Sequence, residues 1–254
     1  MIISRQNEKV KKIRSLKEKK FRAENNEYVA YGYKLVLEAV SLKLPIVCIA
    51  GTGEMLERIG LKETFPGENN GYGFEVIAVS EEVFSSMTEE ASPQGVLAVI
   101  KKPPNKLCPP TGDCILLDGI SDPGNLGTII RTAAAADIKE LYLADCADAF
   151  NPKTVRSAMG GLFRVKVCEC DKKTAVSLIN KPIIVADMDG ENVFTYTKQG
   201  DFCLAVGNEA NGISDYVKNS AKIKVAVPMS NGIESLNAGV SAGIIMYALK
   251  NRKK

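Results

Sequence analysis

Apolar and polar positions along the chain form two alternating patterns, short apolar runs and longer stretches with helical spacing. The short runs predict buried strands and lie at residues 46–50, 74–79, 95–100, 115–117, 140–144, 165–168, 183–186, 202–206 and 223–227. The helical spacing predicts helices at residues 4–20, 31–44, 54–59, 151–159, 172–179, 214–219 and 236–250, with two more that begin at Ser80 and Thr128. This alternation predicts an α/β fold whose mainly parallel sheet is covered on both faces.

Two stretches interrupt the pattern and one of them divides the chain. Residues 62–73 are rich in Gly, Asn and Pro and are typical of an exposed loop. Residues 101–112, KKPPNKLCPPTG, contain four prolines and three lysines. Because proline fits neither a helix interior nor a central strand, this segment is predicted to be a semi-rigid linker. We therefore expect one domain at residues 1–100 and a second at 113–254.

The stretch ILLDGISDPGNLGTIIRTAAAAD, residues 115–137, is the unit around which the second domain is organised. Its apolar start predicts a strand, residues 118–127 predict a tight loop, and the alanine-rich end predicts a helix. Asn125 is expected on the loop and Arg131 one turn into the helix. An amide and a cation would thus lie at the carboxyl end of a strand, where open α/β sheets bind ligands.

A dinucleotide site is the first alternative for a strand, Gly-rich loop and helix. Its fingerprint requires the glycine spacing G-x-G-x-x-G, whereas the glycines here are Gly119, Gly124 and Gly127. Asp145 does lie at a suitable distance, at the end of the next predicted strand. A nucleotide-dependent oxidoreductase therefore stays open as an alternative, although the glycine spacing disfavours it.

Composition and charge narrow the classes of function. The chain has 254 residues, 45% of them hydrophobic, and no apolar run long enough for a membrane span. It has no histidine, which excludes His-based catalysis, and its seven cysteines form no C-x-x-C, so we expect no metal site. These features favour a reducing cytoplasm. Residues 1–22 carry nine basic and two acidic side chains, and the basic tail at 250–254 adds to a charge pattern that suits a polyanion.

Three motifs in fixed order identify a family. They are DGISDPGNLGTIIRTA from Asp118, VGNEANGIS at 206–214, and VAVPMSNGIESLNAGVSAG at 225–243. The set resembles the SpoU (TrmH-type) RNA methyltransferases of the SPOUT superfamily, closely over the C-terminal half and more loosely over the N-terminal third. The resemblance implies an α/β trefoil-knot domain that uses S-adenosylmethionine to methylate a ribose 2'-hydroxyl of structured RNA. Ribosomal RNA is the expected substrate, with transfer RNA, or a catalytically silent RNA-binding protein of the same fold, as alternatives.

The same resemblance implies the site residues. The polar positions that match the family are Asn125, Arg131, Glu209, Ser235 and Asn237. The positions that match or border its cofactor loops are Ala186, Asp187, Met188, Gly207, Val227 and Leu236. Because an arginine normally stays protonated, we expect Arg131 to stabilise the developing alkoxide rather than to take the proton. Glu209 is expected to pair with Arg131 or to accept that proton, and Ser235 to cap the last helix, to serve the site, or both.

The resemblance also implies partners. The N-terminal part is similar to a ribosomal-protein-like RNA-binding domain, although Tyr31 stands where relatives usually have an acidic residue. The last predicted helix is dense in small residues, among them Gly239 and Gly243. These residues predict close packing, in the family against a second copy in a homodimer, although packing within one chain explains the same composition.

Overall fold

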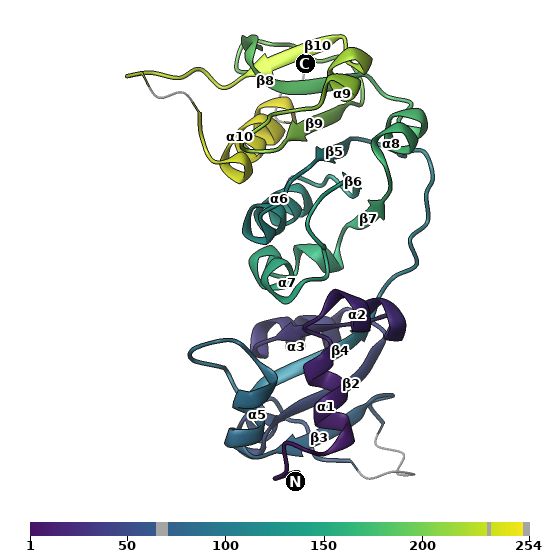
Figure 1. The fold of residues 1–254 in the computed structure, drawn as a ribbon, viewed down its shortest axis with the longest axis vertical. Helices are drawn as coiled ribbons and strands as arrows, with labels where there is room; N and C mark the ends of the chain where they lie inside the picture. The colour runs from purple at the N-terminus through teal and green to yellow at the C-terminus, as the bar shows by residue number, and fades with distance from the viewer. Residues whose placement is uncertain (65–70, 233–234, 251–254) are drawn as a thin grey trace. The chain divides into compact units, whose positions relative to one another are not determined.

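The structure, a computed structural model, describes residues 1–64, 71–232 and 235–250. It divides into two compact units (Figure 1), of which the first comprises Met1–Pro103 with Phe150–Arg156 and the second Pro104–Ala149 with Ser157–Lys254. Half of the predicted loop at 62–73, the tail at 251–254 and two residues of the third motif, Ile233 and Glu234, lie outside the described residues.

The first unit is built on a four-stranded sheet in the order β1-β4-β2-β3. Strand β4 runs antiparallel to β1 and β2, whereas β2 and β3 are parallel. The strands are β1 Glu27–Tyr31, β2 Ile46–Thr52, β3 Glu75–Val79 and β4 Val96–Lys101. The helices are α1 Glu8–Ser15, α2 Lys19–Asn25, α3 Tyr33–Ser41, α4 Gly53–Arg58 and α5 Glu81–Met87. One core joins α1 and α5 to the sheet through residues such as Ile13, Phe84 and Leu97.

The predictions for the start of this unit were wrong in two places. The single helix expected at 4–20 is two helices, because the chain turns between Ser15 and Lys19. The buried Arg22 supports this turn, since its guanidinium donates to the carbonyl oxygens of Leu16 (2.8 Å) and Lys17 (2.6 Å). Residues 27–31 form β1, where no strand was predicted and where Tyr31 was the expected start of a helix. Glu27 is tolerated there because Lys12 and Lys101 both pair with its buried carboxylate at 2.9 Å.

The second unit contains a six-stranded sheet in the order β10-β8-β9-β5-β6-β7. All five pairings are parallel, as predicted. The strands are β5 Cys114–Asp118, β6 Glu140–Ala144, β7 Lys166–Glu169, β8 Ile183–Asn192, β9 Cys203–Gly207 and β10 Ile223–Ala226. The helices that follow β5 along the chain are α6 Pro123–Ala135, α7 Pro152–Ala158, a 3₁₀ turn η1 Gly161–Phe163, α8 Lys172–Leu178, α9 Asp215–Ser220 and α10 Ala238–Lys250. Most of α7 belongs to the first unit, which includes Phe150–Arg156.

The central strands of this sheet are buried on both sides, because helices cover both faces. Cys114 and Leu116 of β5 face a core with Ala175 of α8 and Val217 of α9. Side chains alternate along a strand, so the intervening Ile115 and Leu117 face the opposite side, where α10 packs on α6 and β9 (Figure 1). The apolar run of β5 therefore serves two cores.

The small residues of α10 are used inside the chain. A Cβ atom added to Gly239 would lie 3.0 Å from Thr128 Cγ2, and one added to Gly243 would lie 3.4 Å from Thr132 Cγ2. These glycines therefore let α10 approach α6 closely. The composition that predicted a partner chain is explained by packing within one subunit.

Helix α6 begins five residues earlier than predicted. Pro123 takes its first turn, and the Asp122 carboxylate caps it by accepting from the backbone N–H groups of Gly124 (3.1 Å) and Asn125 (3.3 Å). Proline is favoured at the first helical position and aspartate at the cap. Asn125 therefore lies on the first turn of the helix and not on the loop, two turns before Arg131 on the same helix.

Candidate functional site

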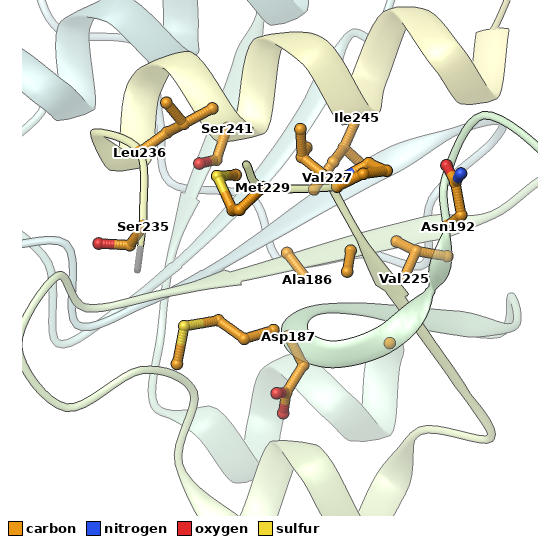
Figure 2. Close-up of a pocket in the computed structure, with 14 residues that line it drawn as sticks. Ala186, Asp187, Asn192, Val225, Val227, Met229, Ser235, Leu236, Ser241 and Ile245 are labelled. Atoms are coloured by element: carbon orange, nitrogen blue, oxygen red, sulfur yellow. The ribbon is translucent and has the colours of Figure 1, made fainter. Parts of the chain in front are cut away.

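A cavity of about 500 Å³ lies in the second unit between the ends of β8 and β10 and the start of α10 (Figure 2). Its size falls in the range of small-molecule sites, ~300–1,000 Å³. Six of the predicted residues line it, namely Ala186, Asp187, Met188, Val227, Ser235 and Leu236. Sequence reasoning missed the other lining residues, which are Gly190, Asn192, Val225, Ala226, Pro228, Met229, Ser241 and Ile245.

The walls of this pocket come from strands and a helix that are far apart in the sequence. Figure 2 shows Ile245 of α10 beside Val227 and Ser241 of the same helix beside Met229. The pocket floor requires a glycine at 190, because an added Cβ there would lie 2.5 Å from the backbone of Val225. Strand β8 passes this point because it extends to Asn192, six residues beyond its predicted end.

Two signals in the sequence pointed to the residues that were missed. Ser241 and Ile245 follow Asn237 at intervals of four residues, which places all three on one face of a helix. Val225, Ala226, Pro228 and Met229 belong to the first five residues of the third motif, of which only Val227 was selected. No local signal indicated Gly190 or Asn192, because their strand was predicted to end before them.

Asp187 is the charged group of the pocket lining. Its carboxylate pairs with Lys218 (3.2 Å) and Lys224 (3.7 Å) and accepts from the backbone N–H of Asp189 (3.2 Å). Burial opposes its ionisation, but the Asp189 amide and the Lys218 ammonium outweigh burial and lower the pKa of Asp187 below its ordinary value. Figure 2 shows the carboxylate directed away from α10. Asp187 thus fixes the rim of the pocket by pairing with two lysines.

Beside the pocket, three of the predicted polar residues form one chain of hydrogen bonds. Asn237 Oδ1 accepts from the backbone N–H groups of Gly239 (3.0 Å) and Val240 (3.3 Å), so its amide nitrogen faces away from α10. That nitrogen donates to Asn125 Oδ1 (2.8 Å), and Asn125 Nδ2 donates to Glu209 Oε1 (2.5 Å). Because the helix N–H groups donate to the oxygen of Asn237, its amide nitrogen must donate to the next side chain. Asn125 accepts this bond with its oxygen and donates with its nitrogen in the same way. Glu209 stands at the accepting end of this chain.

This chain also corrects the prediction for Ser235. The residue that caps α10 is Asn237, whereas Ser235 lies in the pocket lining. Leu236 connects the two, so the polar chain and the pocket are adjacent along the backbone.

Arg131 lies on an exposed part of α6, and among the described residues no ion pair joins it to Glu209. Its backbone packs closely against the start of η1, because a Cβ atom added to Gly161 would lie 2.8 Å from Arg131 Cα. The structure therefore fixes the position of Arg131 on α6 and leaves its guanidinium in solvent. The predicted Arg131–Glu209 pair is absent from the described residues, where Glu209 bonds Asn125 instead.

Gly207 does not line the pocket. A Cβ atom added there would lie 2.3 Å from the carbonyl carbon of Gly212 and 2.4 Å from the backbone nitrogen of Ile213. The glycine is thus required by the tight loop that carries Glu209. Its predicted contact with a cofactor stays a prediction.

The geometry argues against the dinucleotide alternative. A pyrophosphate would need the free N–H groups at the start of α6, and Asp122 already accepts from two of them. Asp145, the candidate ribose ligand, pairs with Lys172 at 3.4 Å. Among the described residues no group of His, Cys, Asp or Glu side chains could hold a metal ion. No helix in the described part is both long and apolar enough to cross a membrane.

Comparison with known proteins places the chain in a family. Residues 113–247 match the model of the SpoU rRNA methylase family, and residues 7–98 match an MRM3-like substrate binding domain. The chain is 35% identical to the 23S rRNA (guanosine(2553)-2'-O)-methyltransferase RlmP of Bacillus subtilis, with 98% of both chains covered. A solved rRNA methyltransferase from Sinorhizobium meliloti with bound AdoMet has a TM-score of 0.84 at 28% identity, covering 97% of this chain and 95% of that one. A structure from Porphyromonas gingivalis assigned to the TrmH family also has a TM-score of 0.84, at 28% identity over the whole of both chains.

The chain therefore belongs to the SpoU rRNA methylase family. It is an RNA methyltransferase with the SPOUT α/β trefoil-knot fold and an N-terminal substrate-binding domain, as the three motifs predicted. The predicted cofactor, S-adenosylmethionine, is confirmed at the level of the family.

Proposed function

We propose that this protein transfers a methyl group from S-adenosylmethionine to a ribose 2'-hydroxyl of ribosomal RNA. The observation that carries the proposal is the polar chain of Asn237, Asn125 and Glu209 beside a pocket of cofactor size. The end-to-end similarity to a 23S rRNA 2'-O-methyltransferase supports the large-subunit RNA as the substrate.

The pocket residues suit this cofactor. Val227, Leu236 and Ile245 offer apolar surface for an adenine ring, and the glycine at 190 lets β8 approach the Val225 backbone closely at the floor. When bound, the cofactor supplies an electrophilic methyl group on a sulfonium, so the transfer needs no metal. Ala186 and Met188 line the pocket with their neighbour Asp187, whose position is fixed by its lysine partners.

The polar chain is suited to deprotonate the incoming hydroxyl. Asn125 holds one oxygen of Glu209, and the carboxylate can accept the proton that the ribose loses. Arg131 remains a cation and stabilises the developing alkoxide or the adjoining phosphate. Ser235 lies in the pocket lining within two residues of Asn237 and orients the reacting groups. Much of the rate enhancement then comes from placement, as in other two-substrate transfers.

In the N-terminal domain, ion pairs within the protein reduce the number of basic side chains that are free to contact RNA. Of the nine basic residues at 1–22, Arg5, Lys9, Lys11, Lys12 and Lys20 already pair with carboxylates. Arg22 is buried against backbone carbonyls. We infer that Arg14, Lys17 and Lys19, which take part in no ion pair among the described residues, contact RNA phosphate.

A neutralised variant tests this surface. Replacing Arg14, Lys17 and Lys19 by Gln should weaken RNA binding and reduce the slope of log affinity against log salt by about 0.7–0.9 per lost phosphate contact. The control replaces Lys9 and Lys11, which are paired with Glu75 and Glu8. Equal losses in both variants would show that general charge, and not this surface, drives binding.

We further propose a homodimer that uses the outer face of α10. Val240 and Tyr247 are 48% and 43% exposed and lie two helical turns apart, on a solvent-facing side of α10 about 70° around the helix from the glycines that pack on α6. Sedimentation equilibrium of Val240→Lys/Tyr247→Lys should give the 27.4 kDa monomer, with Tyr216→Lys on α9 as the exposed-tyrosine control. A wild-type chain that is monomeric and fully active would refute the dimer.

The activity itself is tested by mapping 2'-O-methyl groups in ribosomal and transfer RNA from cells with and without the protein. Loss of one ribose methylation in the large-subunit RNA is the expected result, and a guanosine equivalent to that modified by the Bacillus subtilis relative is the first position to inspect. Loss only in transfer RNA would support that alternative substrate. If cofactor binds but no site is lost, the protein is a silent RNA-binding member of the family.

A further inference from the structure

Asp118 is a buried carboxylate that neither lines the pocket nor belongs to the polar chain. It ends β5 and is 2% exposed. Its Oδ2 accepts from both the backbone N–H (2.8 Å) and the hydroxyl (2.6 Å) of Ser214, and its Oδ1 pairs with Lys172 Nζ at 3.3 Å. A buried charge is costly unless it is paired. These contacts give both oxygens of the buried carboxylate a partner, but they do not by themselves explain why a carboxylate is placed there.

The hydrogen bonds of Ser214 give the first indication of the role of Asp118. It occupies the cap position of α9, where serine normally accepts from the helix N–H groups. Here the side chain makes no capping bond, and its hydroxyl donates to Asp118 instead. The serine thus gives up local helix stabilisation for a bond to β5, a strand 96 residues earlier in the chain.

The second indication is the loop between β9 and Ser214, residues 208–213, which carries Glu209. At its start, Asn208 Nδ2 donates to the carbonyl oxygen of Gly119 (2.8 Å), and Asn208 Oδ1 accepts from Ala210 and Asn211. Asn208 and Gly212 also exchange backbone hydrogen bonds at 3.0 and 2.9 Å. The loop is therefore closed on itself and tied to the end of β5 at both ends.

The end of β5 is also where the chain turns toward α6. Gly119 leads through Asp122 to Asn125, and the loop tied to Asp118 and Gly119 presents Glu209 to that same Asn125. One strand end therefore fixes both partners of the Asn125–Glu209 hydrogen bond. A shift of the loop at Ser214 would change the distance between these two side chains.

From these contacts we infer that Asp118 is a positioning residue for methyl transfer, which acts through Ser214 to hold Glu209 against Asn125. Lys172 compensates its charge, and the pKa of Lys172 is raised chiefly by its bond to Asp118. The inference rests on the proposed role of Glu209. Asp118 itself contacts no reacting group.

The test compares Ser214→Ala with Ser214→Thr, which retains the hydroxyl, and with Ser220→Ala, a control at the end of α9. The Ser220 hydroxyl donates to the carbonyl oxygen of Tyr216 within that helix. Turnover, the KM for RNA and the affinity for S-adenosylmethionine are measured for each variant. Ser214→Ala should lower turnover roughly 10- to 100-fold, since small misplacements of reacting groups have effects of this size. Cofactor affinity should stay within about threefold of wild type, because Ser214 does not line the pocket. Ser214→Thr should restore most of the turnover.

A double-mutant cycle with Glu209→Asp separates positioning from general damage. If Ser214 acts through Glu209, Ser214→Ala should cost much less in the Glu209→Asp background than in the wild type. Additive losses would overturn the inference and leave the role of Glu209 intact. Full activity in Glu209→Gln would instead remove Glu209 from the mechanism, and the inference with it.

Amide hydrogen exchange of the 208–214 loop gives a readout that does not depend on residual activity. Faster exchange in both Ser214→Ala and Asp118→Asn, with the central strand β9 unchanged, is expected. Unchanged exchange in the loop would overturn the inference even if turnover fell.

Discussion

Replacing Asn125 by alanine should disable methyl transfer and leave the cofactor site intact. Asn125 makes two side-chain hydrogen bonds, one with Asn237 and one with Glu209. A hydrogen bond to a charged group contributes about 1.5–3 kcal/mol, and 1.4 kcal/mol corresponds to about a tenfold change. If the Glu209 bond is fully used in the transition state, turnover should fall roughly 10- to 150-fold. The exposed setting of Glu209 favours the lower end, because water can replace part of the lost bond.

A second variant, Asn125→Asp, tests the hydrogen bond between Asn125 and Glu209 more stringently. It keeps the shape of the side chain but places a second carboxylate against Glu209 Oε1, where Asn125 now donates at 2.5 Å. Like charges at such a distance disfavour joint ionisation. We therefore expect a larger loss of turnover in Asn125→Asp than in Asn125→Ala at neutral pH, with partial recovery at lower pH as one carboxylate is protonated.

The assay measures transfer of labelled methyl groups to ribosomal RNA at saturating cofactor and RNA, together with calorimetric titration of S-adenosylmethionine. Asn125 does not line the pocket, so cofactor affinity should change by less than about threefold. Asn219→Ala, an exposed asparagine on α9, serves as the matched control. Wild-type turnover in Asn125→Ala, or a parallel loss of cofactor affinity, would refute the assignment of Asn125 to the chemical step.

Three further predictions follow from individual contacts. Gly190→Ala should destabilise the second unit by about 1–3 kcal/mol and weaken cofactor binding, because the added Cβ would lie 2.5 Å from the Val225 backbone. Denaturant unfolding and calorimetry check this. The control is Gly112→Ala, whose added Cβ would have no atom within 4 Å. Asp187→Asn should lower the free energy of unfolding at neutral pH, because the ion pairs of Asp187 stabilise the folded state only while its carboxylate is ionised. The difference from wild type should shrink as the pH falls below about 3.9, the ordinary pKa of an aspartate. An equal difference at neutral pH and at this acidic pH would contradict the role of the ion pairs. Arg22→Met should destabilise the first unit by about 2–4 kcal/mol, as two buried carbonyls lose a cationic donor, and thermal unfolding that matches wild type would show that water replaces the guanidinium.

Patterns within a few residues determined the parts of the fold that local sequence can specify. The apolar run of β5, directly after the proline-rich segment, predicted a buried strand, and the parallel sheet and the last helix followed from the alternation and periodicity of apolar residues. Where the local pattern was weak, the predictions were wrong. The strand β1 contains Glu27, whose charge is tolerated only because Lys12 and Lys101 reach it from other elements. The start of α6 was placed too late because the cap by Asp122 was not recognised among other loop residues.

The ordered motifs identified the family and several of the polar residues, but not how those residues meet. The Asn125–Glu209 bond spans 84 residues and the Asn125–Asn237 bond spans 112. Only the sheet order β10-β8-β9-β5, which differs from the order in sequence, brings the three motifs to one edge. The sequence by itself therefore determined which side chains are available for chemistry. The tertiary structure decided their partners, because a hydrogen bond depends on distance and direction in space and not on separation along the chain.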